Sequence, residues 1–379
     1  MERLWPILAT LLVACGADEP PLPSFAEPPD IETINVYEST WVEVFAPPGA
    51  QFCRGDGAQM DAQVERLSML LELDPAPQQI PVYVVRNQDA DLINEWCFGS
   101  LVEDRTLGGC FRNWMVVAQP PWVPHELNHA VLHALSPRID SAFWLEAYAS
   151  AWEPERSVGM YFDSLPGQEV VGAYTQGNHF VRWLTQRHGI GPVRDFYSAL
   201  EFDWDRSDID AAFADVFGVS YEESLIQYEA NVAPIYPGFG WCEGVEVIDV
   251  PFGETQVTLG VDCDAPDTHA FYHLYPIEGM YVRRVLRLEQ AANLEIEYSP
   301  YAGILKRHPC LETPVESEDD PRLANSAWDQ FIGTGVPAIG PVTVSDGIPA
   351  GDNLFEFVVP LGEPLIVEAT IRAEPSDGG

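Results

Sequence analysis

Two histidines and a glutamate form the group best suited to chemistry in this sequence. They stand in the run His125-Glu126-Leu127-Asn128-His129, an HExxH pattern. Residues four apart lie on the same face of a helix, so both imidazoles can reach one metal ion. The carboxylate of Glu126 can then hold a water molecule bound to that ion. The motif therefore predicts a helical metal site with its own carboxylate base.

The residues around this motif predict an amphipathic helix. Pro124 suits the first helical turn, where no N–H is needed. On a helical wheel His125, His129 and His133 share one side, with Glu126 beside them. His133 is too far from His125 to share the ion, because two turns span about 11 Å; we expect it to border the cleft or to contact a ligand from behind. The alternative is a surface helix with incidental histidines. The apolar side holds Leu127, Ala130, Val131, Ala134 and Leu135.

A catalytic metal site needs a third protein ligand, and Glu146 is the best candidate. After a break at Ser136-Pro137, the run Phe143–Ala149 (FWLEAYA) predicts a second helix. Glu146 projects from the side opposite its apolar ridge, among small residues that would let the first helix approach closely. Glu153, on the same side, is the reserve candidate. The alternative is that this side is an ordinary solvated polar face.

The elements that must position these residues divide into two parts. Up to about residue 120 the sequence predicts strands and one helix, and from there to residue 232 successive helices. After Pro237-Gly238 short β-rich runs follow one another, which suggests an antiparallel sandwich. We therefore expect an α+β fold, with a first domain at 39–236 and an all-β, sandwich-like domain at 240–373. The early elements are strands at Thr40–Phe45, Ile80–Val85 and Trp114–Ala118 and a helix at Asp56–Leu73.

The motifs HELNH and FWLEAYA, with a short gap between them, resemble the gluzincin group of zinc metallopeptidases. They are most similar to the peptidase-MA-like family, whose second motif resembles WLxEGxA. The similarity extends to YTQGNHFVRWLTQRHG and AFADVFGVSYEESL and covers residues 40–232. Leu132 and Leu135 exclude the metzincin pattern, which has glycine and histidine there. Ala147 replaces the glycine that usually follows the ligand glutamate, which bears on cleft width, and the gap from His129 to Glu146 is short.

This resemblance implies a zincin-like domain, a small sheet plus helices, that works as a zinc-dependent peptidase on a peptide or protein substrate. Zinc would be held by His125, His129 and Glu146, with water in the fourth position. Bound zinc lowers the pKa of that water toward about 7 and polarises the scissile carbonyl. Glu126 would accept the water's proton and pass it to the leaving amine.

The same mechanism needs a donor for the oxyanion and a surface for the substrate. Tyr174, His179 and Tyr161, all downstream of the ligand glutamate, are the candidate donors, and the alternative for each is packing or surface placement. The strand at Trp114–Gln119 is predicted to be the edge strand beside the cleft, where it would pair with an extended peptide.

Two other functions are compatible with parts of the sequence. The first is a catalytically inactive peptidase-fold lipoprotein that acts as a binding or scaffold module. The presence of Glu126 and of all three proposed ligands argues against it. The second is a glycan- or surface-binding lipoprotein in which the β-rich domain makes the contacts.

The N-terminus predicts export and a lipid anchor. Residues 1–14 read as a short signal peptide with an apolar core, and Cys15 follows Leu12-Val13-Ala14 and precedes Gly16. This resembles the lipobox of bacterial lipoproteins, in which the cysteine is lipidated; the alternative is an ordinary signal peptide with a chance cysteine. Residues 15–38, rich in proline and acid, would tether the protein to the cell envelope, periplasmic or on the cell surface.

Cysteine content and charge fit an exported protein. Without Cys15 six of the seven cysteines remain, an even number that allows up to three disulfides, and we favour Cys97–Cys110 because it could close a hairpin loop. The other pairings stay open. Only 19 Lys and Arg face 59 Asp and Glu, a formal net charge of −40 that excludes nucleic acid and anionic lipid as binding surfaces, so the lipid anchor is the predicted membrane contact.

A weaker metal signal lies in the β-rich part. Asp262, Asp264 and Asp267 cluster in GVDCDAPD and could form a calcium loop, because calcium prefers carboxylate oxygens. The spacing lacks the EF-hand glycine and closing glutamate, and an Asp-rich turn is the alternative. His269 and His273 would share a face of a strand, a minor candidate for metal binding.

Overall fold

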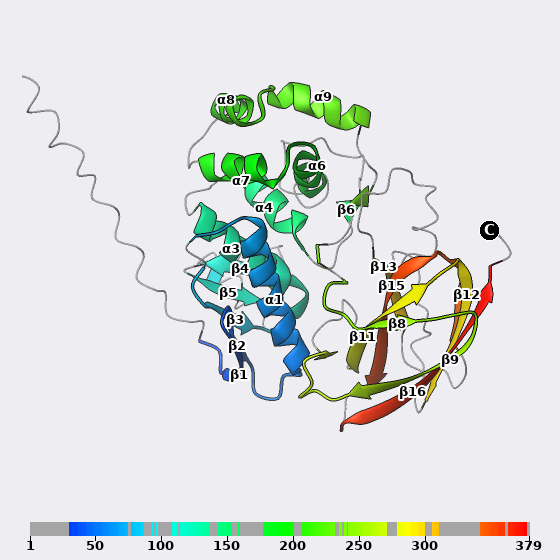
Figure 1. The fold of residues 1–379 in the computed structure, drawn as a ribbon. Coiled ribbons are helices and arrows are strands. Elements are labelled where there is room, and N and C mark those ends of the chain that lie inside the picture. Colours follow the sequence, from blue (N-terminus) through cyan, green and yellow to red (C-terminus); the bar gives the residue numbers. More distant parts are fainter. Residues whose placement is uncertain are drawn as a thin grey trace, which may run out of the picture.

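The computed structural model contains an α+β fold with several sheets, as the sequence predicts (Figure 1). Residues 1–29, with the predicted signal peptide, Cys15 and most of the tether, lie outside the described part of the chain. Among the described residues, no helix is both long enough and apolar enough to cross a membrane. The structure describes residues 30–74, 77–86, 93, 96–97, 108–112, 114–136, 142–153, 158–159, 177–200, 206–231, 235–236, 239–240, 242–270, 279–299, 305–310, 342–360 and 363–376.

A mixed five-stranded sheet opens the chain, in the order β1-β2-β3-β5-β4. The pairs β2–β3 and β3–β5 are parallel, and the outer strands β1 and β4 are antiparallel to their neighbours. In β2 and β3 every second residue is buried, so one face of the sheet lies against the core. The strands are β1 (Ile34–Glu38), β2 (Val42–Ala46), β3 (Ile80–Val84), β4 (Gly109–Arg112) and β5 (Met115–Ala118), and β1 falls inside the segment predicted as a tether.

α1 lies between β2 and β3 in sequence, the other helices follow β5, and all pack with the sheet around one core. In Figure 1, α8 and α9 lie above α6 and α7, and α1 runs alongside the first sheet and α3. Aromatic rings fill the helical part: Trp144 contacts Phe196 and Tyr221 edge-on. The helices are α1 (Arg54–Leu70), α3 (Val123–Leu135), α4 (Ala142–Ala151), α6 (Asn178–His188), α7 (Ile190–Ala199), α8 (Arg206–Phe217) and α9 (Tyr221–Asn231), with a short ladder of β6 (Val158–Gly159) and β7 (Ile235–Tyr236).

The second part of the chain is all-β. One sheet has the order β10-β11-β15-β13 with β8 also paired to β11, and the other has the order β14-β12-β16-β9. Buried residues from both sheets, such as Leu259 and Phe355, share a second core, as in a sandwich. The strands are β8 (Val247–Asp249), β9 (Gly253–Val261), β10 (Thr268–His269), β11 (Gly279–Leu288), β12 (Ala292–Ser299), β13 (Leu305–Pro309), β14 (Val342–Ile348), β15 (Gly351–Pro360) and β16 (Leu365–Pro375).

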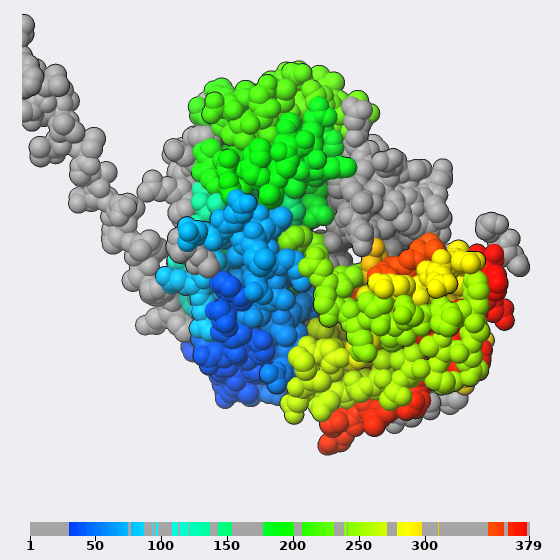
Figure 2. All heavy atoms as spheres, viewed as in Figure 1, coloured from blue at the N-terminus to red at the C-terminus, as the bar shows by residue number. Residues whose placement is uncertain are grey.

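The start of α1 joins the two parts. Cys53, just before α1, forms a disulfide with Cys263 of the sandwich, and the buried carboxylate of Asp56 accepts a hydrogen bond from the backbone N–H of Ala270 at 3.1 Å. A Cβ on Gly55 would lie 2.3 Å from the carbonyl oxygen of Thr268, so only glycine permits this approach. Figure 2 shows the two parts in contact along this side.

Three disulfides link the described cysteines. The predicted Cys97–Cys110 bridge is confirmed, and the pairings that the sequence left open are Cys53–Cys263 and Cys242–Cys310. Three disulfides in one chain are typical of proteins exported to an oxidising compartment.

Candidate metal centre

The HExxH motif lies on α3, which forms as its sequence predicts. A 3-10 turn at Pro120–Trp122 leads into the helix, and Pro124 occupies its first turn. The apolar side, with Leu127, Ala130 and Val131, is buried in the first core. His125 and His129 are also almost fully buried, at 2% and 7% exposure, so the alternative of a surface helix with incidental histidines does not describe this element.

Three ligand atoms converge beside α3. The Nε2 atoms of His125 and His129 are 3.0 Å apart, and Oε2 of Glu146 lies 2.8 Å from the first and 3.3 Å from the second. Tetrahedral zinc with bonds of about 2.0–2.1 Å would hold its ligands about 3.3 Å apart, so this spacing fits one small cation with little movement. The structure thus assembles the three residues that the sequence nominated as ligands.

The hydrogen bonds of His125 favour a cation at this position. Its Nδ1 lies 2.8 Å from Oε1 of Glu153, so the N–H there donates to the carboxylate, and in the neutral imidazole the lone pair is then on Nε2. That lone pair faces Nε2 of His129 and Oε2 of Glu146, two further electron-rich atoms. Positive charge, from protons or from a metal ion, is needed to hold the three together.

Glu153, the reserve candidate for the third ligand, therefore does not lie where a third ligand would. It contacts the far nitrogen of His125, whereas Oε2 of Glu146 lies beside Nε2. A carboxylate behind a ligand histidine fixes the tautomer and the ring orientation and raises the basicity of the ligating nitrogen.

The electrostatics of the group follow from burial and from this carboxylate pair. Burial alone would lower the pKa of His125, but hydrogen bonds to Glu146 and Glu153 raise it to about 10. Burial alone would raise the pKa of Glu146, yet the two imidazoles hold it well below its usual range. Burial raises the pKa of Glu126, with His129 and His125 acting in the opposite direction. The site is thus a buried cluster of carboxylates and imidazoles in which a positive charge is stabilised.

The replacement of glycine by Ala147 is explained by the packing of α4. Ala147 is fully buried, and its Cβ faces Gly177 at the start of α6: a Cβ on Gly177 would lie 2.9 Å from that of Ala147 and 3.1 Å from the ring of Phe143. The glycine that permits close approach therefore lies on α6. The methyl group of Ala147 points toward this contact.

The candidate oxyanion donors and His133 are the remaining residues that the sequence analysis named. His179 is fully buried on α6, and its Nδ1 lies 2.7 Å from the hydroxyl of Tyr228 on α9. His133 packs against the rings of Phe111 and Trp114, with centroids 5.3 and 5.1 Å away. Tyr174 and Tyr161 lie outside the described residues.

The prediction that Trp114–Gln119 forms the edge strand is wrong. β5 is paired on both sides, with β3 and β4, so within the described sheet β4 is the outer strand. The residue before β4 approaches the turn that leads into α3: a Cβ on Gly108 would lie 2.0 Å from the ring of Trp122, and that ring is 6.3 Å from the imidazole of His125. β4 ends at Arg112 and β5 begins at Met115 as its antiparallel neighbour. The hydrophobic pattern alone does not show which of the two strands is outermost.

Among the described residues, the aspartates and histidine of the weaker candidate metal sites do not form a group that could hold an ion. Asp262, Asp264 and Asp267 do not appear as a group with converging oxygens; Asp267 pairs with Arg284 at 3.0 Å, and Asp262 accepts the backbone N–H of Asp264 at 3.0 Å, as in an Asp-rich turn. His269 stacks on Tyr281, and His273 lies outside the described residues.

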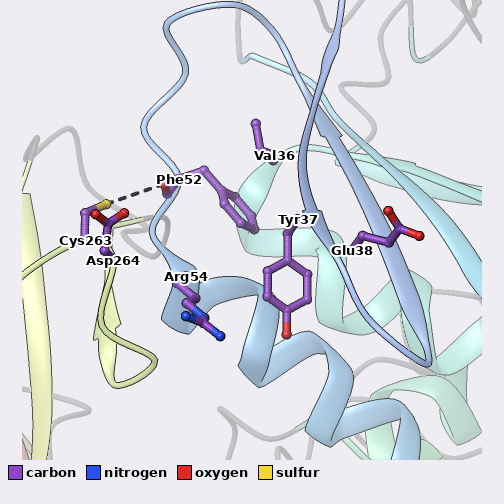
Figure 3. Close-up of a pocket in the computed structure, with 7 residues that line it drawn as sticks. All are labelled: Val36, Tyr37, Glu38, Phe52, Arg54, Cys263 and Asp264. Carbon is purple, nitrogen blue, oxygen red and sulfur yellow. Dashed lines mark hydrogen bonds between the residues drawn. The ribbon is translucent and has the colours of Figure 1, made fainter.

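A separate pocket of about 450 Å³ lies where the two parts of the chain meet (Figure 3). It contains none of the proposed metal ligands. Its lining residues are Val36, Tyr37, Glu38, Phe52, Arg54, Cys263 and Asp264.

Sequence reasoning did not find the polar residues that connect the helices around the site. Gln63 of α1 and Asn128 of α3 are buried and hydrogen-bonded to each other at 2.8 Å. Asn128 has one signal in the sequence, because it is a polar residue next to the apolar side of the predicted helix. Nothing in the sequence indicates its partners.

Comparisons with known proteins add little to this geometry. No family model and no curated protein matches the chain. The aminopeptidase A of Legionella pneumophila, solved with aspartic acid, is 11% identical with a TM-score of 0.34, and the match covers 89% of this chain. This chain spans only 37% of that protein's length.

Two smaller proteins are similar to one part of the chain. They are periplasmic inhibitors of g-type lysozyme from Aeromonas hydrophila and Salmonella Typhimurium, 10% and 9% identical, each with a TM-score of 0.19. Each match covers 34% of this chain and 97% or 98% of the inhibitor. These three likenesses are too low to assign a fold or an activity, so the side-chain geometry carries the functional argument.

Proposed function

We propose that this protein is a zinc-dependent peptidase of the cell envelope. The observation that carries the proposal is the convergence of His125 Nε2, His129 Nε2 and Glu146 Oε2 within 3.3 Å of one another. Glu126, in the same helical turn as the first histidine, completes the set needed for hydrolysis.

The donor set fits zinc. Two imidazole nitrogens and one carboxylate oxygen are a frequent ligand set of catalytic zinc, with the fourth position left open. These three atoms would hold the ion, and zinc bound there supplies a Lewis acid that lowers the pKa of water to about 7 and polarises a carbonyl. The hydrogen bond from His125 to Glu153 keeps its Nε2 lone pair available for the ion.

The residues of the chain then perform the proton transfers. Glu126 accepts a proton from the attacking water as the new C–O bond forms at the scissile carbonyl carbon. It returns this proton to the amide nitrogen as the C–N bond breaks, so that a carboxylic acid and an amine are released. Its carboxylate is buried, at 6% exposure, which limits access of bulk water to this step.

Extended peptides are the substrates that the fold suits best. β4 is the outer strand of the described sheet next to α3, and an extended peptide would pair with it as an added strand. The formal net charge of −40 favours basic peptides and proteins over acidic ones. Lipidation of Cys15 would keep the enzyme at a membrane surface, in line with export indicated by the disulfides.

The test combines metal analysis with a base-deficient variant. Purified mature protein should hold about one zinc per chain, and Glu126→Gln should keep that zinc while peptide cleavage falls by about 10²–10⁴-fold. Glu65→Gln, the same charge change at an exposed position of α1, is the control and should cleave normally. Cleavage by Glu126→Gln at the control rate, or wild-type protein without zinc, would contradict the proposal and favour a binding or scaffold role.

A further inference from the structure

A buried amide network links the three helices around the metal centre. The side-chain nitrogen of Gln63 on α1 donates to the backbone carbonyl of Pro124 at 2.7 Å and to Oδ1 of Asn128 at 2.8 Å, both on α3. The nitrogen of Asn128 donates in turn to the backbone carbonyl of Ala149 on α4 at 2.7 Å. Both amide residues are almost completely buried, at 2% and 0% exposure.

The acceptor on α4 is a carbonyl at the end of that helix. The last carbonyls of a helix have no intrahelical partner, and burial makes it costly to leave them unpaired. α4 ends at Ala151, so the carbonyl of Ala149 takes its hydrogen bond from Asn128, and the carbonyl of Ala151 takes one from Arg182 of α6 at 3.3 Å. Side chains of neighbouring helices therefore cap α4.

This cap lies between the two carboxylates that meet His125. Ala149 is one helical turn after Glu146 and four residues before Glu153. Asn128 is itself between the two histidines of the motif. One hydrogen bond thus joins the helix that carries the histidines to the segment that carries both carboxylates.

We propose that Asn128 is a positioning residue for the metal centre. It holds α4 against α3 so that Glu146 and Glu153 reach the two nitrogens of His125, and Gln63 anchors it to α1. This inference rests on the proposed function, and it assigns to Asn128 the task of setting the distance between the two ligand-bearing helices.

An amide is the side chain that this position requires. Asn128 accepts from Gln63 and donates to Ala149 at the same time. A carboxylate could accept but could not donate to a carbonyl, and an aliphatic side chain could do neither. Because the oxygen of Asn128 accepts one hydrogen bond and its nitrogen donates the other, the orientation of the amide is fixed.

The experiment measures zinc affinity of metal-free protein by competition with a chromophoric chelator, together with the visible spectrum of the cobalt-substituted protein. Asn128→Leu should bind zinc about 10–100-fold more weakly, comparable to the loss of a group that orients a ligand, because both Glu146 and Glu153 would shift with α4. Gln63→Leu, which leaves the bond to α4 in place, should lose about threefold to tenfold. Asn353→Leu is the matched control, because it removes another buried amide, within the sandwich.

The cobalt spectrum separates positioning from stability. Asn128→Leu should shift the cobalt absorption bands, whereas Asn353→Leu should keep the wild-type bands even if both melt at a lower temperature. Wild-type affinity and spectrum in folded Asn128→Leu would overturn the inference. If that variant does not fold, unchanged zinc affinity in Gln63→Leu overturns it instead. A wild-type chain that binds no zinc would contradict the proposed function itself.

Discussion

Replacing Glu153 with glutamine tests the carboxylate behind the metal centre. Glu153 is 8% exposed, and its carboxylate faces Nδ1 of His125 at 2.8 Å. The glutamine oxygen could still accept this hydrogen bond, but without its negative charge. The substitution therefore removes the ionic part of the interaction and little of its shape.

The expected loss follows from the two kinds of hydrogen bond. A bond to a charged group contributes about 1.5–3 kcal/mol and a neutral one about 0.5–1.5 kcal/mol, so Glu153→Gln should cost about 1–1.5 kcal/mol. At about 1.4 kcal/mol per factor of ten, zinc affinity should fall about tenfold. Because the pair is buried, screening by solvent and salt should reduce this value little.

Zinc titration of metal-free protein against a competing chelator measures this loss. Glu65→Gln carries the same change in net charge on an exposed part of α1 and should bind zinc as the wild type does. Zinc affinity of Glu153→Gln within twofold of this control would refute the idea that the carboxylate tunes His125.

Three further substitutions test other parts of the fold. Burial lowers the pKa of His269 below its ordinary 6.5, so the free energy of unfolding should be highest above pH 6.5 and should fall as the pH drops below 6.5. His269→Gln should remove this decline, measured by urea unfolding between about pH 7.5 and about pH 5. Replacing Cys53 and Cys263 together by serine should lower the free energy of unfolding by about 2–5 kcal/mol in denaturant titration. Gly177→Ala should cost about 1–3 kcal/mol because its Cβ would crowd Ala147, and this cost should be smaller when Ala147 is also replaced by glycine, measured as a double-mutant cycle of melting temperatures.

Each of these has a result that would contradict it. Asp56, Arg283 and Glu356 also face His269, but they are present in both the wild type and His269→Gln. A difference in unfolding free energy between these two proteins that does not change with pH would therefore refute the prediction for His269. Unchanged unfolding of the double serine variant would show that the disulfide does not stabilise the contact between the two parts. An equal cost of Gly177→Ala with alanine and with glycine at position 147 would refute the close approach of α4 and α6.

Local sequence was enough to predict the parts of the site that repeat along one helix. The four-residue spacing of His125 and His129 and the apolar side of α3 follow from helical periodicity alone. Glu146 could be nominated because a second amphipathic helix follows a proline break. The apolar run IPVYVV likewise predicted the strand at Ile80–Val85, close to the observed bounds of β3.

Contacts between distant elements could not be predicted in this way. The bond from Asn128 to the carbonyl of Ala149 depends on where α4 ends and how it packs, which no local pattern records. The pairing of Cys53 with Cys263, separated by 210 residues, depends on how the sandwich docks on α1. β4 (GCFR) has no apolar run that marks it as a strand, so its position outside the apolar β5 (MVVA) could not be predicted.

Anomalous diffraction at the zinc edge, from crystals of the mature protein, tests the central claim most directly. We expect one peak per chain, about 2.0–2.2 Å from Nε2 of His125, Nε2 of His129 and an oxygen of Glu146. No peak at this position, or an ion held elsewhere while the carboxylate of Glu146 points away from both imidazoles, would contradict the account.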